Sequence, residues 1–171
     1  AIDCTFGERS MVVGEILVRS RSVISGYWRQ PELTREVMRG DWFSTGDLGY
    51  LDEDGYLFIS DRKRDMVISG GVNIYPAEIE SVAIHMPGVH DCAVFGIPDP
   101  EFGEALMAMV EPQPGVALDP DMVRAYLKLH LADYKVPKHI EIARELPRED
   151  SGKIFKRRLR APYWAKAGRT I

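Results

Sequence analysis

The order of the apolar patterns after residue 64 constrains the fold of this chain more than any other feature of the sequence. Five segments alternate between helical spacing, with apolar residues three and four positions apart, and short runs typical of strands. The order is helix, strand, strand, helix, strand, and the segments are 76–87, 90–97, 104–111, 119–131 and 139–143. Pro76 begins the first helix, and Asp119 is the N-cap of the second. This order predicts a small α+β domain in which helices pack on one sheet.

The residues before this domain are mostly of β character. Residues 14–20 read as a short strand, and residues 30–38 as a short helix with Pro31 near its first position. The stretch 52–55 (Asp-Glu-Asp-Gly) lies between two apolar runs and predicts a β-hairpin, because glycine accepts the positive φ that such turns require. We place the domain boundary between residues 63 and 64, within a charged run. A β-rich segment of about 60 residues is marginal as an independent fold.

Composition and charge narrow the classes of protein. The 171 residues are 45% hydrophobic and 28% charged, as in soluble globular domains, and the net charge of −4 provides no basic field for nucleic acid. Cys4 and Cys92 lie far apart and the four histidines lack metal-ligand spacing, so we expect no protein-bound metal. Few cysteines, no leader pattern and no long apolar segment favour the cytoplasm, without a transmembrane segment. The absence of an initiator methionine suggests a piece of a longer protein.

The stretch LPREDSGKIFKRRLR, residues 146–160, places a lysine directly after Ser-Gly in an acidic turn. A phosphate-binding loop of the G-x-x-x-x-G-K-[ST] type would need glycine where Pro147 stands and a hydroxyl residue where Ile154 stands. Lys153 is therefore not the lysine of such a loop. Taken alone, the stretch is typical of an ordinary hairpin turn with a solvated lysine.

Four stretches in this order resemble the C-terminal third of acyl-CoA synthetases. They are GDWFSTGDLGYLDEDGYLFI, DRKRDMVISGGVNIYPAEIE, GIPDPEFGE and LPREDSGKIFKRRL, and the resemblance spans about residues 14–160. These synthetases belong to the adenylate-forming superfamily, together with luciferases and peptide-synthetase adenylation domains. The resemblance implies that residues 1–63 are the β-rich end of a large N-terminal AMP-binding domain and that residues 64–171 are a mobile C-terminal lid.

The resemblance also implies two residues that bind the ribose of ATP. Asp47 would accept hydrogen bonds from the ribose hydroxyls, which suits a carboxylate because it accepts two donors at once. Arg62 matches the family arginine that binds the same ribose. Taken alone, Asp47 would be a turn-forming residue and Arg62 a surface cation. Arg64, two positions after Arg62, matches the hinge between the domains.

A second group matches the coenzyme A site of the family. Ser69, Gly70 and Gly71 correspond to the loop that lines the pantetheine tunnel, where glycine lets the backbone approach the ligand without a Cβ. Phe102 and Tyr134 match aromatic positions beside coenzyme A, where an adenine can stack. Without the resemblance, the Gly-Gly pair would be a plain turn before a helix that begins with proline, and the two aromatic residues would be core residues.

Lys153 then becomes the lysine that contacts the reacting carboxylate and the nucleotide while the acyl-adenylate forms. A carboxylate that attacks an α-phosphate brings two anions together, and an ammonium group placed there stabilises the transition state. Three positions depart from the family pattern: Asp61 stands for a usual glycine, Arg64 for Asp or Lys, and Val72 for a frequent Glu. None of the three removes a catalytic group.

The sequence therefore predicts part of an ATP-dependent acyl-CoA synthetase that uses ATP, Mg²⁺ and coenzyme A and activates a carboxylic acid, with a fatty acid as the default. The alternatives are another adenylate-forming enzyme, such as an aryl-CoA ligase, a luciferase-like enzyme or an adenylation domain, or a non-catalytic lid or binding module. The family's phosphate loop and acid pocket do not occur in these 171 residues, so we expect the chain alone to be inactive and to need the N-terminal domain.

Overall fold

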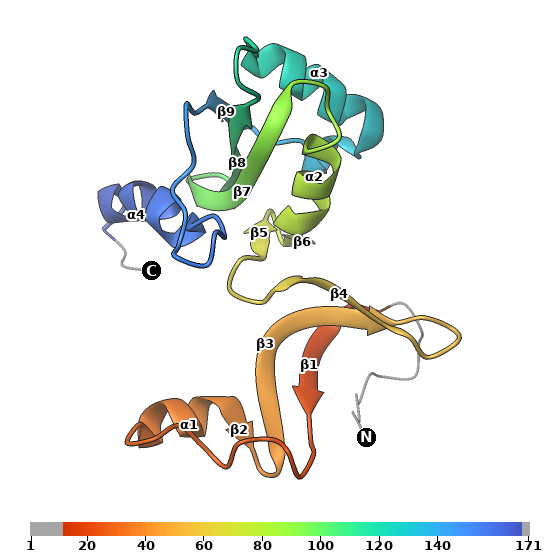
Figure 1. Cartoon of the computed structure of the whole chain (residues 1–171), viewed down its shortest axis with the longest axis vertical. Coiled ribbons are helices and arrows are strands. Elements are labelled where there is room, and N and C mark those ends of the chain that lie inside the picture. Colours follow the sequence, from red (N-terminus) through yellow and green to blue (C-terminus); the bar gives the residue numbers. More distant parts are fainter. Residues whose placement is uncertain (1–11, 169–171) are drawn as a thin grey trace. The chain divides into compact units, whose positions relative to one another are not determined.

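The structure is a computed structural model that describes residues 12–168. Cys4 and the start of the chain, on which two of the expectations above rest, lie outside the described residues. The chain forms two compact units, one that ends at Arg64 and one that begins at Asp65, and Figure 1 shows the elements of each. This division falls one residue after the expected boundary.

The first unit contains a four-stranded antiparallel sheet in which β3 pairs with β1, β2 and β4. The elements are β1 (Gly14–Val18), α1 (Pro31–Val37), β2 (Met38–Arg39), β3 (Trp42–Leu51) and β4 (Leu57–Arg62). The predicted strand and helix form, each slightly shorter than expected.

The predicted hairpin at residues 52–55 joins β3 to β4. The Asp52 carboxylate accepts hydrogen bonds from the backbone N–H groups of Asp54 (3.1 Å) and Tyr56 (2.8 Å), and Gly55 has a φ of 83°. Aspartate and glycine thus play the turn roles that their chemistry suggests. Beyond the hairpin, a register shift in the ladder between Leu48 and Gly49 places Asp47 on β3 opposite Arg62 on β4.

The second unit contains a five-stranded sheet in which β8 is central. The strands are β5 (Val67–Ser69), β6 (Val72–Ile74), β7 (Val89–Asp99), β8 (Gly103–Pro112) and β9 (His139–Ile142). β8 pairs antiparallel with β5 and β7 and parallel with β9, while β6 pairs with β5. The helices are α2 (Pro76–Ala83), α3 (Pro120–His130), the 3₁₀ helix η1 (Asp133–Lys135) and α4 (Lys156–Lys166). The predicted α+β class is confirmed.

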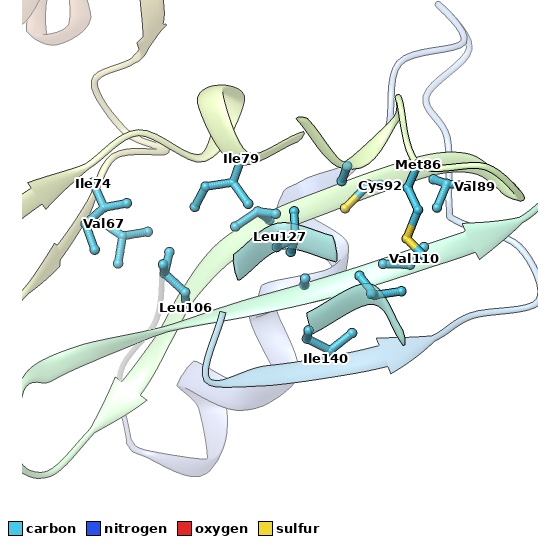
Figure 2. Close-up of a cluster of buried hydrophobic side chains, with 14 residues drawn as sticks. Val67, Ile74, Ile79, Met86, Val89, Cys92, Leu106, Val110, Leu127 and Ile140 are labelled. Carbon is cyan, nitrogen blue, oxygen red and sulfur yellow. The ribbon is translucent and has the colours of Figure 1, made fainter. Parts of the chain in front are cut away.

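Strand alternation gives this sheet two apolar faces. One face packs against α2 and α3, and Figure 2 shows its cluster, which includes Cys92 and Val110 from β7 and β8, Ile79 from α2 and Leu127 from α3. The neighbouring residues of the same strands point to the other face, where Phe95 and Met107 pack with the α4 side chains Leu159 and Tyr163. The helices therefore cover both faces, because the central parts of β7 (Cys92–Ile97) and β8 (Ala105–Val110) are continuously apolar.

Three features of the second unit differ from the sequence prediction. Residues 67–74, for which no strand was predicted, form the hairpin β5–β6, with the Gly70–Gly71 pair as its turn. The basic run after Lys153 belongs to α4, although Pro162 lies inside that helix. The first predicted helix ends at Ala83 instead of Met86, but Met86 is still buried in the core.

Candidate functional site

The first unit holds Asp47 and Arg62 as an ion pair. The two residues are directly opposite in the β3–β4 ladder, and Arg62 Nε lies 2.9 Å from Asp47 Oδ1. The Arg62 side chain is 53% exposed and that of Asp47 26% exposed, so both remain accessible to a ligand. Such a pair offers a carboxylate acceptor and guanidinium donors to one polar ligand.

The backbone around Asp47 explains why the carboxylate points to this side. Thr45 Oγ1 accepts a hydrogen bond from Asp47 N (3.1 Å) and donates one to the Ile16 carbonyl (2.9 Å). Gly46 has a φ of 74°, and its carbonyl accepts a hydrogen bond from Lys63 N at 2.8 Å. The Thr-Gly-Asp sequence thus makes an irregular strand segment whose carboxylate position is fixed by its neighbours.

The second unit presents Gly70 and Gly71 as the two central residues of the β5–β6 turn. Their φ values are 57° and 81°, and positive φ at both positions is what a tight two-residue hairpin requires. Gly70 N–H donates to the Phe102 carbonyl at 2.9 Å. A Cβ on Gly70 would lie 3.1 Å from Phe102 Cδ1, whereas a Cβ on Gly71 would meet nothing within 4 Å. Of the two glycines, only Gly70 therefore lies against the Phe102 ring.

A pocket of about 440 Å³ adjoins this turn, and four of the five predicted coenzyme A residues line it. Its lining residues are Ser69, Gly70, Val72, Ile74, Phe102, Ala105, Leu106, Asp133, Tyr134, Val136 and Lys138. Gly71 is not among them. The Phe102 and Tyr134 side chains are 45% and 56% exposed, so these aromatic residues are not core residues. The pocket is mostly apolar, with two accessible rings and one lysine at its border.

The lysine of the pocket is held by a carboxylate that also shapes the Phe102 loop. Asp99 Oδ1 accepts hydrogen bonds from the backbone N–H groups of Glu101 and Phe102, both at 3.0 Å, while Oδ2 lies 2.7 Å from Lys138 Nζ. Lys138 Nζ is also 5.9 Å from the centre of the Phe102 ring. The hydrogen bond from Lys138 and the two backbone donors lower the pKa of Asp99 to about 2, so the carboxylate is charged at neutral pH.

Lys153 lies on an exposed turn whose geometry confirms the expected hairpin. Glu149 N donates to the Lys153 carbonyl at 2.8 Å, Gly152 N donates to the Glu149 carbonyl at 2.8 Å, and Gly152 has a φ of 82°. Within residues 12–168, the Lys153 ammonium makes no hydrogen bond or ion pair that competes with a ligand. Arg64 is exposed and lies in the turn between β4 and β5, at the end of the first unit.

The structure thus groups the predicted residues into three places. Asp47 and Arg62 are paired in the first unit, the predicted coenzyme A residues surround one pocket in the second, and Lys153 lies on a separate turn. Sequence reasoning missed Asp99 and Lys138. Asp99 could have been predicted, because it lies in the stretch GIPDPEFGE and an Asp before Pro is a common turn former. Lys138 had no local signal, since β9 alone brings it to the pocket.

The described residues contain neither a metal-binding cluster nor a membrane-spanning helix. No group of three or more His, Cys, Asp or Glu side chains in residues 12–168 is arranged to hold a metal ion. None of the helices in that range is long and apolar enough to cross a membrane.

Comparison with known proteins shows what this chain is similar to. Residues 78–153 match the family model described as the AMP-binding enzyme C-terminal domain. The chain is 50% identical over 150 residues to a feruloyl-CoA synthase of Amycolatopsis, covering 88% of this chain and 30% of that protein. It is 45% identical over 152 residues to the long-chain-fatty-acid–CoA ligase FadD13 of Mycobacterium tuberculosis, covering 89% of this chain and 30% of that protein.

Solved structures give the same result. ATP-bound MatB from Rhodopseudomonas palustris superposes with a TM-score of 0.84 at 43% identity, over 91% of this chain and 31% of MatB. The amide bond synthetase McbA from Marinactinospora thermotolerans gives a TM-score of 0.82 at 41% identity, over 91% of this chain and 32% of McbA. Residues 78–153 therefore correspond to the AMP-binding enzyme C-terminal domain, and over about nine-tenths of its length the chain is similar to adenylate-forming enzymes. It spans about 30% of the length of the curated relatives it matches.

Proposed function

We propose that this chain is the C-terminal part of an ATP-dependent acyl-CoA synthetase. The whole enzyme would join a carboxylic acid to ATP, forming acyl-adenylate and pyrophosphate, and would then transfer the acyl group to coenzyme A. Residues 1–63 would complete a large N-terminal AMP-binding domain, and residues 64–171 would be its mobile lid. The observation that carries this proposal is the pocket that unites Ser69, Gly70, Phe102 and Tyr134, because an adenylating enzyme without a thiol substrate needs no such site.

The pocket has the chemistry of a coenzyme A site. The exposed rings of Phe102 and Tyr134 offer faces on which an adenine can stack, and each such stack is worth about 1–3 kcal/mol. Lys138 at the border supplies a cation for phosphate groups, while the apolar lining suits the pantetheine arm. The Gly70–Gly71 turn lets the backbone approach that narrow arm without a side chain.

Asp47, Arg62 and Lys153 would serve the first half-reaction. The Asp47–Arg62 pair would hold the ribose hydroxyls of ATP. The Lys153 ammonium would bridge the attacking carboxylate and the α-phosphate, where it would offset the negative charge that gathers in the transition state. Mg²⁺ would arrive with the nucleotide. Arg64 would be the hinge about which the lid turns between the two half-reactions.

We propose a fatty acid as the acid substrate, with an aromatic acid as the alternative. The printed names of the relatives support both, since one is a long-chain-fatty-acid–CoA ligase and another a feruloyl-CoA synthase. A panel of fatty and cinnamic acids tested with the full-length protein would decide between the two. The acid with the higher kcat/KM is the substrate. If the protein instead formed amides, as the name of McbA indicates for that enzyme, product would form when an amine is added but not when coenzyme A is added.

The deciding experiment replaces Lys153 in the full-length protein. Lys153→Ala should slow acid-dependent exchange of pyrophosphate into ATP by roughly 10² to 10³, as when one preorganised electrostatic contact is lost. Thioester formation from supplied acyl-adenylate should stay nearly unchanged. Arg157→Ala, which removes an exposed cation from α4, is the matched control. Wild-type exchange by Lys153→Ala would mean that the lysine is only part of a hairpin turn.

A second measurement separates the enzyme from a non-catalytic module. The 171-residue chain alone should bind coenzyme A but show no acid-dependent exchange of pyrophosphate into ATP, because it lacks a phosphate loop and an acid pocket. If the full-length protein also failed to catalyse exchange with every acid of the panel, the non-catalytic module would be the better description.

A further inference from the structure

The Arg148 side chain joins the hairpin that carries Lys153 to the sheet. The two strands of the hairpin meet at the bridge between Arg148 and Ile154, and Phe155 N closes its base by donating to the Pro147 carbonyl at 2.7 Å. From this base the Arg148 guanidinium reaches in two directions. Nη1 donates to the Gly152 carbonyl at 3.1 Å, and Nη2 donates to Asp91 Oδ2 on β7 at 2.8 Å.

The Gly152 carbonyl belongs to the peptide group that precedes Lys153. A donor on that oxygen fixes the orientation of the peptide, and with it the direction in which the Lys153 side chain leaves the turn. Gly152 has a φ of 82° and a Cβ there would meet nothing within 4 Å, so packing does not hold this peptide in place. The hydrogen bond from Arg148 Nη1 to the Gly152 carbonyl holds it.

The other end of the bridge is rigid. Asp91 accepts a hydrogen bond from Cys92 N (2.9 Å) through its second oxygen, and Cys92 is buried in the core. Opposite Asp91 in the ladder, Glu111 accepts a hydrogen bond from Leu146 N (2.8 Å) at the buried start of the hairpin. Arg148 therefore connects the Gly152–Lys153 peptide to a carboxylate whose own position is fixed by the sheet.

The charges around Arg148 favour this bridge. Glu111 lies 3.8 Å from Nη2, in addition to Asp91, and His90 lies 3.8 Å from Glu111. The hydrogen bond to Asp91, together with the charges of Asp91 and Glu111, raises the pKa of Arg148. A lysine could not make both contacts in the same way, because the planar guanidinium presents two parallel donors and an ammonium is a single point charge.

We propose that Arg148 is a positioning residue for Lys153: it ties the Gly152–Lys153 peptide to Asp91 and so aims the Lys153 ammonium before any ligand binds. The catalytic part of this inference rests on the proposed function, in which Lys153 contacts the reacting groups. The structural part stands on the contacts of Arg148 alone. A preorganised lysine accelerates the reaction because the charge does not have to be ordered in the transition state.

The structural part is tested on the 171-residue chain by amide hydrogen exchange. In Arg148→Ala, the amides of Glu149 and Gly152 should exchange about tenfold faster or more, as expected when a hydrogen bond to a charged group is lost. The amide of Leu131, which is bonded to Leu127 in α3, is the internal reference and should not change. Arg157→Ala should leave all three amides at their wild-type rates. Unchanged exchange of Glu149 and Gly152 in Arg148→Ala would overturn the inference.

Asp91→Asn keeps the test decisive if Arg148→Ala does not fold. It leaves an amide that can still accept a hydrogen bond but removes the charge, so exchange in the turn should rise by a smaller factor. In the double variant with Arg148→Lys, Asp91→Asn should add little to the exchange rates of the turn amides, because both changes break the same bridge. Fully additive effects would show that the two residues act separately.

The catalytic part needs the full-length protein. Arg148→Ala should lower kcat for adenylation by about tenfold with little change in KM for ATP, and Arg148→Lys should recover only part of it. If wild-type protein adenylates no acid, the proposed function fails while the exchange result still decides the structural part. If the wild type is active and Arg148→Ala keeps its full kcat, the positioning role fails and the proposed function stands.

Discussion

Alanine substitutions at the two adjacent glycines of the β5–β6 turn should separate backbone strain from pocket geometry. Gly70 and Gly71 both have positive φ, at 57° and 81°, so alanine at either position adopts a left-handed conformation. They differ in their surroundings. The new Cβ would lie 3.1 Å from Phe102 Cδ1 at Gly70 and would meet no atom within 4 Å at Gly71.

The expected loss of stability is similar for the two variants. A left-handed conformation costs an alanine roughly 1–2 kcal/mol relative to glycine. At Gly70 the ring must also move by a few tenths of an ångström, but Phe102 is 45% exposed and can turn outward, so we expect less than about 1 kcal/mol of additional destabilisation. The displaced ring is the one on which an adenine would stack. Losing that stack should weaken coenzyme A binding by about tenfold in Gly70→Ala, and Gly71→Ala should bind nearly as the wild type does.

Urea denaturation of the 171-residue chain measures the free energy of unfolding, and titration calorimetry with coenzyme A measures Kd. A chemical shift change of the Phe102 ring in Gly70→Ala, without one in Gly71→Ala, would verify that the ring has moved. Equal Kd values for the two variants, despite a displaced ring, would refute the assignment of Phe102 to the ligand. Equal ring shifts in the two variants would refute the packing argument.

Three further predictions concern other parts of the chain. Lys156→Ala should reduce the free energy of unfolding, measured by urea denaturation, by about 1–3 kcal/mol. The Lys156 ammonium lies 2.7 Å from the Glu80 carboxylate, and the Glu80 side chain is only 19% exposed, so the variant leaves a largely buried charge without its partner. The pKa of Asp99 is lowered to about 2 in the fold, so its stabilising contribution is complete above pH 4 and should be lost as the pH falls toward 2. Asp99→Asn should therefore flatten the dependence of the free energy of unfolding on pH in this range. An unchanged slope would argue against the contact with Lys138. In the full-length protein, Arg64→Pro should slow thioester formation much more than adenylation, because proline fixes φ at the proposed hinge; equal loss of both steps would contradict the hinge.

The parts of the fold that were predictable have local causes. Asp119 caps α3 by accepting a hydrogen bond from Asp121 N at 2.7 Å, and the pattern of a cap followed by proline gave the start of that helix correctly. The hairpin after β3 followed from Asp52 and Gly55 in the same way. For the site, the resemblance implied that Asp47 and Arg62 bind one ribose, but their ion pair was not predicted.

The parts that were missed depend on contacts that are distant in sequence or on patterns that compete. The β5–β6 hairpin did have a local signal, a Gly-Gly pair between apolar residues, but the charged run before it obscured the short strands. α4 has a weakly apolar face and an internal Pro162, and it is held by tertiary contacts such as the hydrogen bond from Trp164 Nε1 to the Gly96 carbonyl at 3.0 Å. No pattern within residues 156–166 predicts a contact with a carbonyl that lies 68 positions before Trp164.

The second unit places its two candidate functions at opposite ends of β7. The Lys153 turn is tied to Asp91, near the start of the strand, while the pocket adjoins Asp99, at its end. At about 3.4 Å per residue these ends are roughly 27 Å apart, whereas the acid, the α-phosphate and the thiol react within a few ångströms of one another. If the proposed roles hold, a rigid unit in one orientation would bring either Lys153 or the proposed coenzyme A pocket to a single reaction centre, but not both. A synthetase that uses both must turn this unit between its half-reactions, and Arg64, where the first unit ends, is the residue at which we propose that the rotation occurs.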